Sequence, residues 1–162
     1  MQQPTGPITV EYAASWIEDY QPMPAFYAVV FDLAGDEFVK AFGMGLEYTA
    51  RTENSWMVVE GHLLYQNEAC LVDRLRGDRL RIESRLLDFD AKRAHLYQEM
   101  YREQTLLASQ EQMMLHVNLL TRRASPFPPD ILAQLEQLRR HHQTFPLPPA
   151  AVGRRISVAR RT

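Results

Sequence analysis

Cysteine is almost absent from this sequence, since Cys70 is the only one among 162 residues. A single cysteine excludes a disulfide within the chain and any metal cluster built from several thiolates. The sequence also lacks a run of about 18 apolar residues and a basic start followed by an apolar segment, so we expect neither a membrane-spanning helix nor a secretion signal. These absences predict a cytoplasmic protein with no membrane partner.

An excess of charge of one sign is missing as well. The chain has 18 basic and 20 acidic residues, which gives a net charge of -2. This balance provides no overall field that would attract nucleic acid, so we predict no nucleic-acid partner. With 46% apolar residues, a chain of this length can build one ordinary core, and we expect a single domain over residues 1–162 with its core at about 7–123.

The first half of the chain predicts a strand followed by a long helix. Residues 7–14 are rich in strand formers, and Pro24 suits the first position of a helix, where its missing N–H costs nothing. Gly43 and Gly45 are expected to end this helix. Apolar residues recur through it at the helical spacings of three and four, at Tyr27, Phe31, Ala34, Phe38 and Ala41.

From Tyr48 to Thr121 the pattern changes to the near alternation of apolar and polar residues that is typical of strands. We predict five strands there, with breaks at 52–55, 67–78, 88–92 and 102–105. A proline-rich link, SPFPP at 125–129, then leads to a short amphipathic helix, and residues 128–162 are expected to form this helix and a surface tail. The apolar face of the helix is marked by Ile131, Leu132, Leu135 and Leu138.

One strand, one long helix and several antiparallel strands form an α+β order in which a sheet wraps around a helix. The segments VVEGHLLY, DFDAKRAHLYQEMY, EQMMLHV and RRASPFPP follow the helix start in the order seen in one family. Over roughly residues 7–156 the chain resembles the hot-dog-fold thioesterases of the 4-hydroxybenzoyl-CoA type, and especially those that act on betainyl-CoA in carnitine breakdown.

The resemblance implies an antiparallel sheet of about six strands around one long helix, with a short C-terminal helix. It implies an acyl-CoA thioesterase that hydrolyses a short acyl-CoA, with a trimethylammonium-bearing acyl group as the leading candidate. Coenzyme A would enter only as part of the substrate, and no other cofactor is expected. The family pairs sheet edges, so a homodimer or homotetramer is expected.

The catalytic element of that family is altered in this sequence. Members carry Asp-Tyr-Asn-Gly-His-Met before the helix, with a catalytic aspartate, whereas this chain reads Glu18-Asp19-Tyr20-Gln21-Pro22-Met23. Matching the Asp-Tyr pair selects Asp19, and counting five residues back from Met23 selects Glu18; we favour Asp19. Read without the resemblance, either carboxylate could simply cap the helix.

Thioester hydrolysis gives a chemical reason for a carboxylate at this place. The negative charge on the carbonyl oxygen could be held by backbone N–H groups at the helix start, and since Pro24 has none, the candidates are those of Ala25, Phe26 and Tyr27. The carboxylate could act as a general base on water or attack the carbonyl directly, and the sequence leaves both routes open.

Glu60 and His62 are further catalytic candidates. Alternation puts them on one face of a strand, and the resemblance places that strand near the active site of a partner protomer. A satisfied core pair or a dimer contact is the alternative interpretation. No second histidine or cysteine stands at ligand spacing around His62, so we predict no metal.

Two sets of residues are candidates for binding the substrate. Aromatic faces attract a quaternary ammonium group, although core packing would explain the same residues. Lys92 and Arg93 could meet the phosphates of coenzyme A, or could be solvated strand ends. The aromatic residues expected to gather near the site are Trp16, Tyr20, Phe26, Tyr27, Trp56 and Tyr65.

Two other functions stay open on the sequence. A hydratase or dehydratase of the same fold would normally need a histidine at the helix start, and none is present there. A non-catalytic acyl-CoA-binding or assembly protein would explain the altered Gln21-Pro22 loop.

Overall fold

The computed structural model describes residues 8–13, 24–66, 79–146, 152–154 and 156. The long helix is α1 (Pro24–Lys40), and it is accompanied by α2 (Leu46–Thr52) and α4 (Pro129–His142). None of the helices in this part of the chain is both long and apolar enough to cross a membrane. The strands are β1 (Ile8–Ala13), β2 (Asn54–Tyr65), β3 (Arg79–Phe89), β4 (Arg93–Arg102), β5 (Thr105–Asn118) and β6 (Arg123–Ala124).

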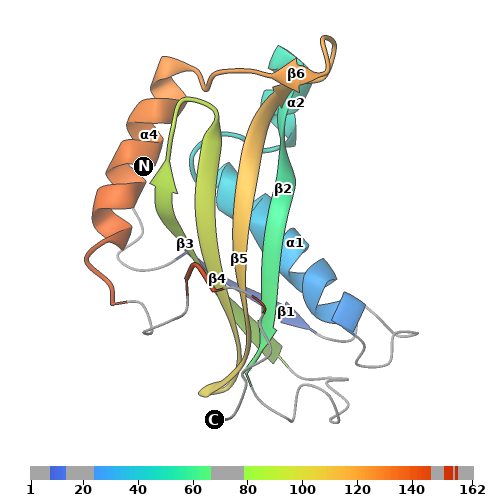
Figure 1. Ribbon diagram of the computed structural model, residues 1–162, viewed down its shortest axis with the longest axis vertical. Coiled ribbons are helices and arrows are strands. Elements are labelled where there is room, and N and C mark those ends of the chain that lie inside the picture. The colour runs from blue at the N-terminus through green and yellow to red at the C-terminus, as the bar shows by residue number, and fades with distance from the viewer. Residues whose placement is uncertain (1–7, 14–23, 67–78, 147–151, 155, 157–162) are drawn as a thin grey trace.

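The strands form one antiparallel sheet in the order β1-β3-β4-β5-β2, and β6 pairs with β5. The predicted α+β arrangement of six strands around one long helix is confirmed. Helix α1 runs diagonally across the sheet, while α4 lies along its margin beside β3 (Figure 1). Strand β2 therefore forms one edge of the sheet over its twelve residues.

Helix α1 forms because its apolar residues keep the helical period and pack together on the sheet. Phe31, Ala34 and Phe38 are fully buried, as predicted. Ala41 was expected to continue this stripe, but the helix ends at Lys40 and Ala41 is exposed. Gly43 has a φ of 84°, a left-handed conformation that glycine adopts without strain, and it turns the chain away.

Helix α2 replaces the first of the five strands predicted after α1. The carbonyl oxygen of Gly45 accepts the N–H of Tyr48 at 2.9 Å, and the Thr52 hydroxyl donates to the carbonyl of Tyr48, so local hydrogen bonds support the turn. The buried Tyr48 side chain then anchors it in the core. Seven residues show too little of either period to separate helix from strand by pattern. Only four strands lie between Asn54 and Asn118 among the residues described.

Two apolar clusters make up the core. The first lies under the start of α1 and includes Ile82, Met100 and Ala108 of the sheet. The second lies under the end of α1, where Leu96 and Met114 of the sheet meet apolar residues of α2 and α4. We call these the first and second core clusters.

Helix α4 covers the part of β3 that β1 does not reach. Strand β1 pairs with β3 only as far as Ser84, and the N–H of Leu86 donates instead to Nδ1 of His142 at 2.9 Å. An imidazole nitrogen that accepts a hydrogen bond must be unprotonated, so His142 is neutral in the fold. Burial, with smaller effects from His141 and Arg85, lowers the pKa of His142 from 6.5 to about 4.

This shift predicts a loss of stability in mild acid. Above pH 6.5 His142 is neutral in both the folded and the unfolded chain. Between about pH 6.5 and 4 only the unfolded chain takes up a proton at this residue. His142 therefore lowers the free energy of unfolding by up to about 1.4 kcal/mol for each unit by which the pH decreases in this range. Denaturant titrations at pH 7, 6, 5 and 4 should give a shallower pH dependence for His142→Gln than for the wild type. His62→Gln, on the edge strand β2 at the other side of the sheet from β3, is the control, and equal slopes for all three proteins would contradict this account of His142.

Candidate functional site

The start of α1 places a helix N-terminus beside aromatic side chains. The first N–H groups of any helix lack partners within the helix and carry the positive end of its dipole. Phe26 and Tyr27 are buried there, with ring centroids 5.5 Å apart, and the Tyr27 ring lies edge-on to that of Tyr65, 5.4 Å away at the end of β2. The predicted residues Trp16, Glu18, Asp19 and Tyr20 lie outside the described residues.

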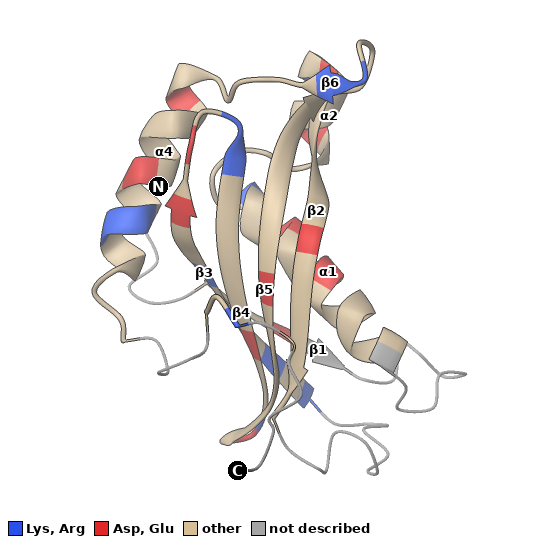
Figure 2. Ribbon diagram, in the orientation of Figure 1, with Lys and Arg blue, Asp and Glu red and all other residues tan. Residues whose placement is uncertain are grey.

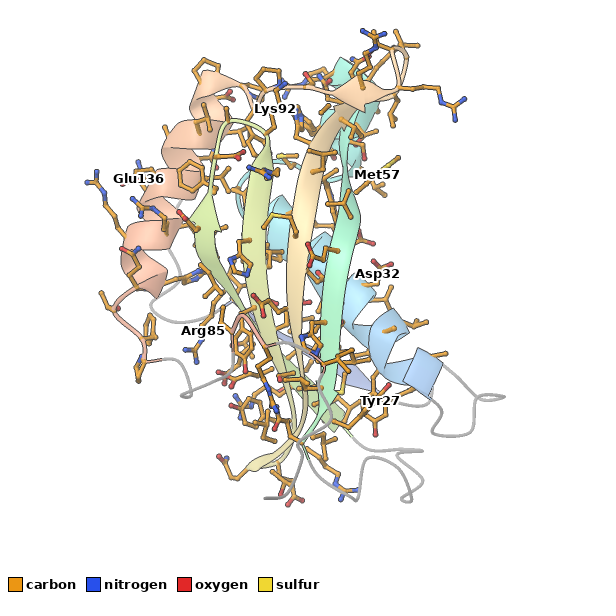
Figure 3. All side chains as sticks on the ribbon, viewed as in Figure 1. Tyr27, Asp32, Met57, Arg85, Lys92 and Glu136 are labelled. Atoms are coloured by element: carbon orange, nitrogen blue, oxygen red, sulfur yellow. The ribbon has the colours of Figure 1, made fainter. Side chains whose placement is uncertain are left out.

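A cavity of about 640 Å³ opens between α1 and the first half of β2. Its α1 wall carries Asp32, Asp36 and Glu37, and acidic positions follow α1 in Figure 2. In Figure 3, Asp32 on α1 and Met57 on β2 mark its two sides. Burial, together with the neighbouring Asp32 and Glu37, raises the pKa of Asp36, and Lys40 acts in the opposite direction. The cavity therefore has a negative potential.

Trp56 lies at this cavity and not with the other aromatic candidates. A Cβ added to Gly35 of α1 would stand 3.5 Å from the indole, so the ring packs on the helix backbone, and it joins the second core cluster. Tyr65 lies nine residues further along β2, which is about 30 Å in an extended strand. The prediction that Trp56 gathers with Tyr27 and Tyr65 is wrong within one chain, because β2 is too long.

Glu60 and His62 share one face of β2, as predicted, and the face is the one turned away from α1. A β-bulge at Val59 shifts the pairing between Val58 and Glu60, so Glu60 lies opposite Met113 and His62 opposite Glu111. Without the extra residue, alternation would have turned Glu60 toward α1 with Val58. The two side chains therefore do not join the start of α1 within the chain.

A second cavity of about 290 Å³ lies on this outer face of the sheet, lined by Glu60, His62, His95 and Glu111. His95 Nε2 lies 2.7 Å from Glu111 Oε1, and the N–H of Gly153 donates to Glu111 Oε2 at 2.8 Å. Glu111 thus connects β4 and β5 with the C-terminal segment. Among the described residues, no three His, Cys, Asp or Glu side chains are arranged to hold a metal ion.

His116, which is fully buried on β5, was not among the predicted site residues. Its Nδ1 lies 2.7 Å from the carbonyl oxygen of Ser125, which can only accept, so Nδ1 carries the proton and the Tyr48 hydroxyl donates to Nε2 at 2.9 Å. Burial lowers the pKa of His116. This neutral histidine connects α2 to the segment after β6. Its alternation with Met114 in EQMMLHV was the available signal for an inward position.

The basic candidates lie far from the start of α1. Lys92 and Tyr27 are at opposite ends of the molecule in Figure 3. Lys92 is exposed, and Arg93 forms an ion pair with Asp90 at 2.6 Å. The structure therefore does not bring Lys92 or Arg93 to the aromatic pair of Tyr27 and Tyr65.

Comparison with known proteins gives consistent results. The family model of the thioesterase-like superfamily matches residues 22–135. A betainyl-CoA thioesterase of Pseudomonas aeruginosa is 33% identical over 136 residues, which are 83% of this chain and 82% of that protein. An L-carnitine dehydrogenase/betainyl-CoA thioesterase of Ruegeria pomeroyi is 31% identical over 69% of this chain, and the match covers 22% of that longer protein.

A solved structure extends the likeness to the fold. A Staphylococcus aureus protein in complex with CoA superimposes with a TM-score of 0.81 and 24% sequence identity, over 93% of this chain and 94% of that one.

The acidic cavity predicts a stability gain on neutralisation. Because the pKa of Asp36 is raised in the fold, its charged form is disfavoured there, and Asp36→Asn should raise the melting temperature at pH 7. The gain should vanish near pH 3, where the wild-type carboxyl is protonated in both states. Thermal melts at both pH values test this, with the exposed Glu103→Gln as the control. A lower melting temperature for Asp36→Asn at pH 7 would show that the carboxylate has a stabilising partner.

Proposed function

The chain belongs to the thioesterase-like superfamily and is an acyl-CoA thioester hydrolase, and from this premise we propose that its substrate is betainyl-CoA or another short acyl-CoA with a polar acyl group. The observation that carries the proposal is the start of α1, where a helix N-terminus adjoins the ring contact between the buried Tyr27 and the exposed Tyr65. An anion-binding helix end suits the thioester carbonyl, and aromatic rings suit a quaternary ammonium group. The P. aeruginosa relative, which matches over most of both chains, supports this choice of acyl group.

We propose that the thioester carbonyl oxygen lies against the N–H groups of Ala25, Phe26 and Tyr27. These donors would hold the negative charge that develops on the oxygen as the tetrahedral intermediate forms. Coenzyme A is then the leaving group, which fits the CoA complex of the S. aureus protein.

We propose Asp19 as the group that starts the reaction, with Glu18 as the alternative. Acting as a general base, the carboxylate takes a proton from water, the oxygen adds to the carbonyl carbon, and the intermediate collapses with cleavage of the C–S bond. The departing thiolate then takes up the proton. Acting as a nucleophile, the carboxylate would displace the thiolate to form a mixed anhydride, which water hydrolyses.

We also propose that two chains pair through β2. This strand is an edge in the described sheet, and Met57, Val58 and Val59 expose apolar side chains along it. An edge of this length with apolar side chains is unfavourable in water and is covered when a second copy pairs with it.

Amide substitutions test the two carboxylates. Asp19→Asn removes both the base and the nucleophile while keeping the size of the side chain, so kcat should fall by roughly 100-fold or more, whereas Glu18→Gln should have a milder effect. The assay is release of free thiol from a panel of acyl-CoAs, with circular dichroism to confirm folding. The reverse order of effects would move the role to Glu18. If turnover is unchanged in both variants, Glu18 and Asp19 have no catalytic role and serve only to start helix α1.

Sedimentation tests the pairing of β2. The wild type should sediment at least as a dimer at micromolar concentration, and Val59→Lys should shift it toward monomer because charge on the edge opposes pairing. Leu120→Lys changes another exposed apolar residue, in the turn after β5, and should leave the oligomer intact. A wild-type monomer would count against the dimer.

A further inference from the structure

A row of polar side chains crosses the inner face of the sheet beneath α1. In the register of β3, β4 and β5, Ser84 lies opposite Gln98, and Gln98 opposite Gln110. Ser84 and Gln98 are 0% exposed and Gln110 is 9% exposed. The row separates the first core cluster, which has Ile82 and Met100 on one side, from the second. Polar groups at the centre of a core are costly unless they are hydrogen-bonded, so this row calls for an explanation.

Two acceptor atoms of the row have no hydrogen-bond donor among the described residues. Gln98 Nε2 donates to Ser84 Oγ at 3.0 Å and to the main-chain oxygen of Phe31 in α1 at 3.3 Å. Because a carbonyl oxygen only accepts, the contact with Phe31 fixes which end of the Gln98 amide is the nitrogen. The Oε1 atoms of both Gln98 and Gln110 are buried, and no hydrogen-bond donor from the residues that the structure describes reaches either atom. Two residues paired in the sheet thus each have a buried amide oxygen with partial negative charge.

The row ends at Gln110, beside the edge strand β2. Gly61 on this strand has no side chain, and a Cβ placed there would lie only 3.7 Å from Gln110 Nε2. A glycine at this point leaves the Gln110 amide at the margin of the sheet, which agrees with its small exposed fraction.

The row lies one step from the proposed thioester position. On the inner face Tyr65 pairs with Ala108, and the next inward pair is Leu63 with Gln110, about 7 Å away along the strands. The same step is seen along helix α1. Tyr27 contacts Tyr65, and the main-chain oxygen of Phe31, about one helical turn later, accepts a hydrogen bond from Gln98. A short acyl group bound at the start of α1 and directed along the helix would therefore end beside Gln110 and Gln98.

We propose that Gln110 and Gln98 determine the acyl specificity of this thioesterase by receiving a positively charged acyl end at their buried amide oxygens. The inference rests on the proposed function. A quaternary ammonium group has no N–H to donate, but its charge is stabilised by the amide dipoles and by the rings of Tyr27 and Tyr65. A neutral acyl end of the same shape leaves both oxygens without a partner, and a site with buried polar groups discriminates strongly against such an analogue.

The test compares two thioesters of equal shape. In 3,3-dimethylbutanoyl-CoA a carbon atom replaces the nitrogen of betainyl-CoA, so the two differ in charge and hardly in size. The wild type should prefer betainyl-CoA by at least tenfold in kcat/KM. Gln110→Leu should lower kcat/KM for betainyl-CoA about tenfold or more while the neutral analogue is hydrolysed as well as before or better.

Two further variants keep the test decisive. Gln110→Glu retains an acceptor of the same size, and it should keep or increase the preference for betainyl-CoA. Gln112→Leu is the matched control, because Gln112 is a buried glutamine on the same face of β5 whose amide is not among those without partners; its substrate ratio should stay close to that of the wild type. Thermal melts establish that each variant is folded.

The outcomes separate the two proposals. If the wild type hydrolyses both thioesters and folded Gln110→Leu keeps the wild-type ratio of kcat/KM values, the specificity assignment is wrong while the thioesterase function stands. If Gln110→Leu does not fold, loss of the preference in Gln110→Glu overturns the assignment. If the wild type hydrolyses neither thioester, the proposed substrate class fails and the assignment fails with it.

Discussion

The packing of α1 on the sheet is the constraint from which the other features follow. Tyr27, Phe31 and Phe38 lie on one stripe of the helix, and each is at most 1% exposed, so the rotation of α1 about its axis is fixed. This rotation turns Asp32 and Asp36 outward beside β2, where they line the acidic cavity. It also directs the helix start toward the end of β2, where Tyr65 meets Tyr27. A single buried stripe thus positions the N-terminal end of α1, the aromatic contact of Tyr27 with Tyr65 and the acidic cavity.

The same stripe explains why the fold was largely predictable from the sequence. Periodicity survives in a long element because many residues repeat it, so α1 and the strands from β3 to β5 could be recognised. Helix α2 could not, since seven residues held by Gly45 and Tyr48 resemble a short strand. The bulge at Val59 is a further limit, because one inserted residue reverses the faces of the rest of β2. Alternation correctly joined Glu60 with His62 and could not tell which face they occupy.

The candidate site was only partly predictable, for a related reason. The contact of Tyr27 with Tyr65 follows once β2 lies beside α1, and both residues were predicted to lie near the site. Trp56 belongs to the same strand, but the length of β2 carries it to the other core cluster. Gln98, Gln110 and His116 were not recognised at all, because a polar residue in an alternating strand is normally read as facing water. Each of them instead faces inward.

These inward polar groups also bear on what the fold was selected to do. A row through Ser84, Gln98 and Gln110 divides the core into two clusters, and two of its oxygens lack donors among the described residues, which costs stability that leucine at these positions would avoid. Asp36, which lines the cavity with Trp56, is also held at a cost, since burial and like charge raise its pKa. Sequences tend to depart from local folding rules where a site requires it. Both departures lie on the α1 side of the sheet, so this side, more than the outer face with Glu60 and His62, is where binding of a charged acyl group would offset the cost of the polar groups.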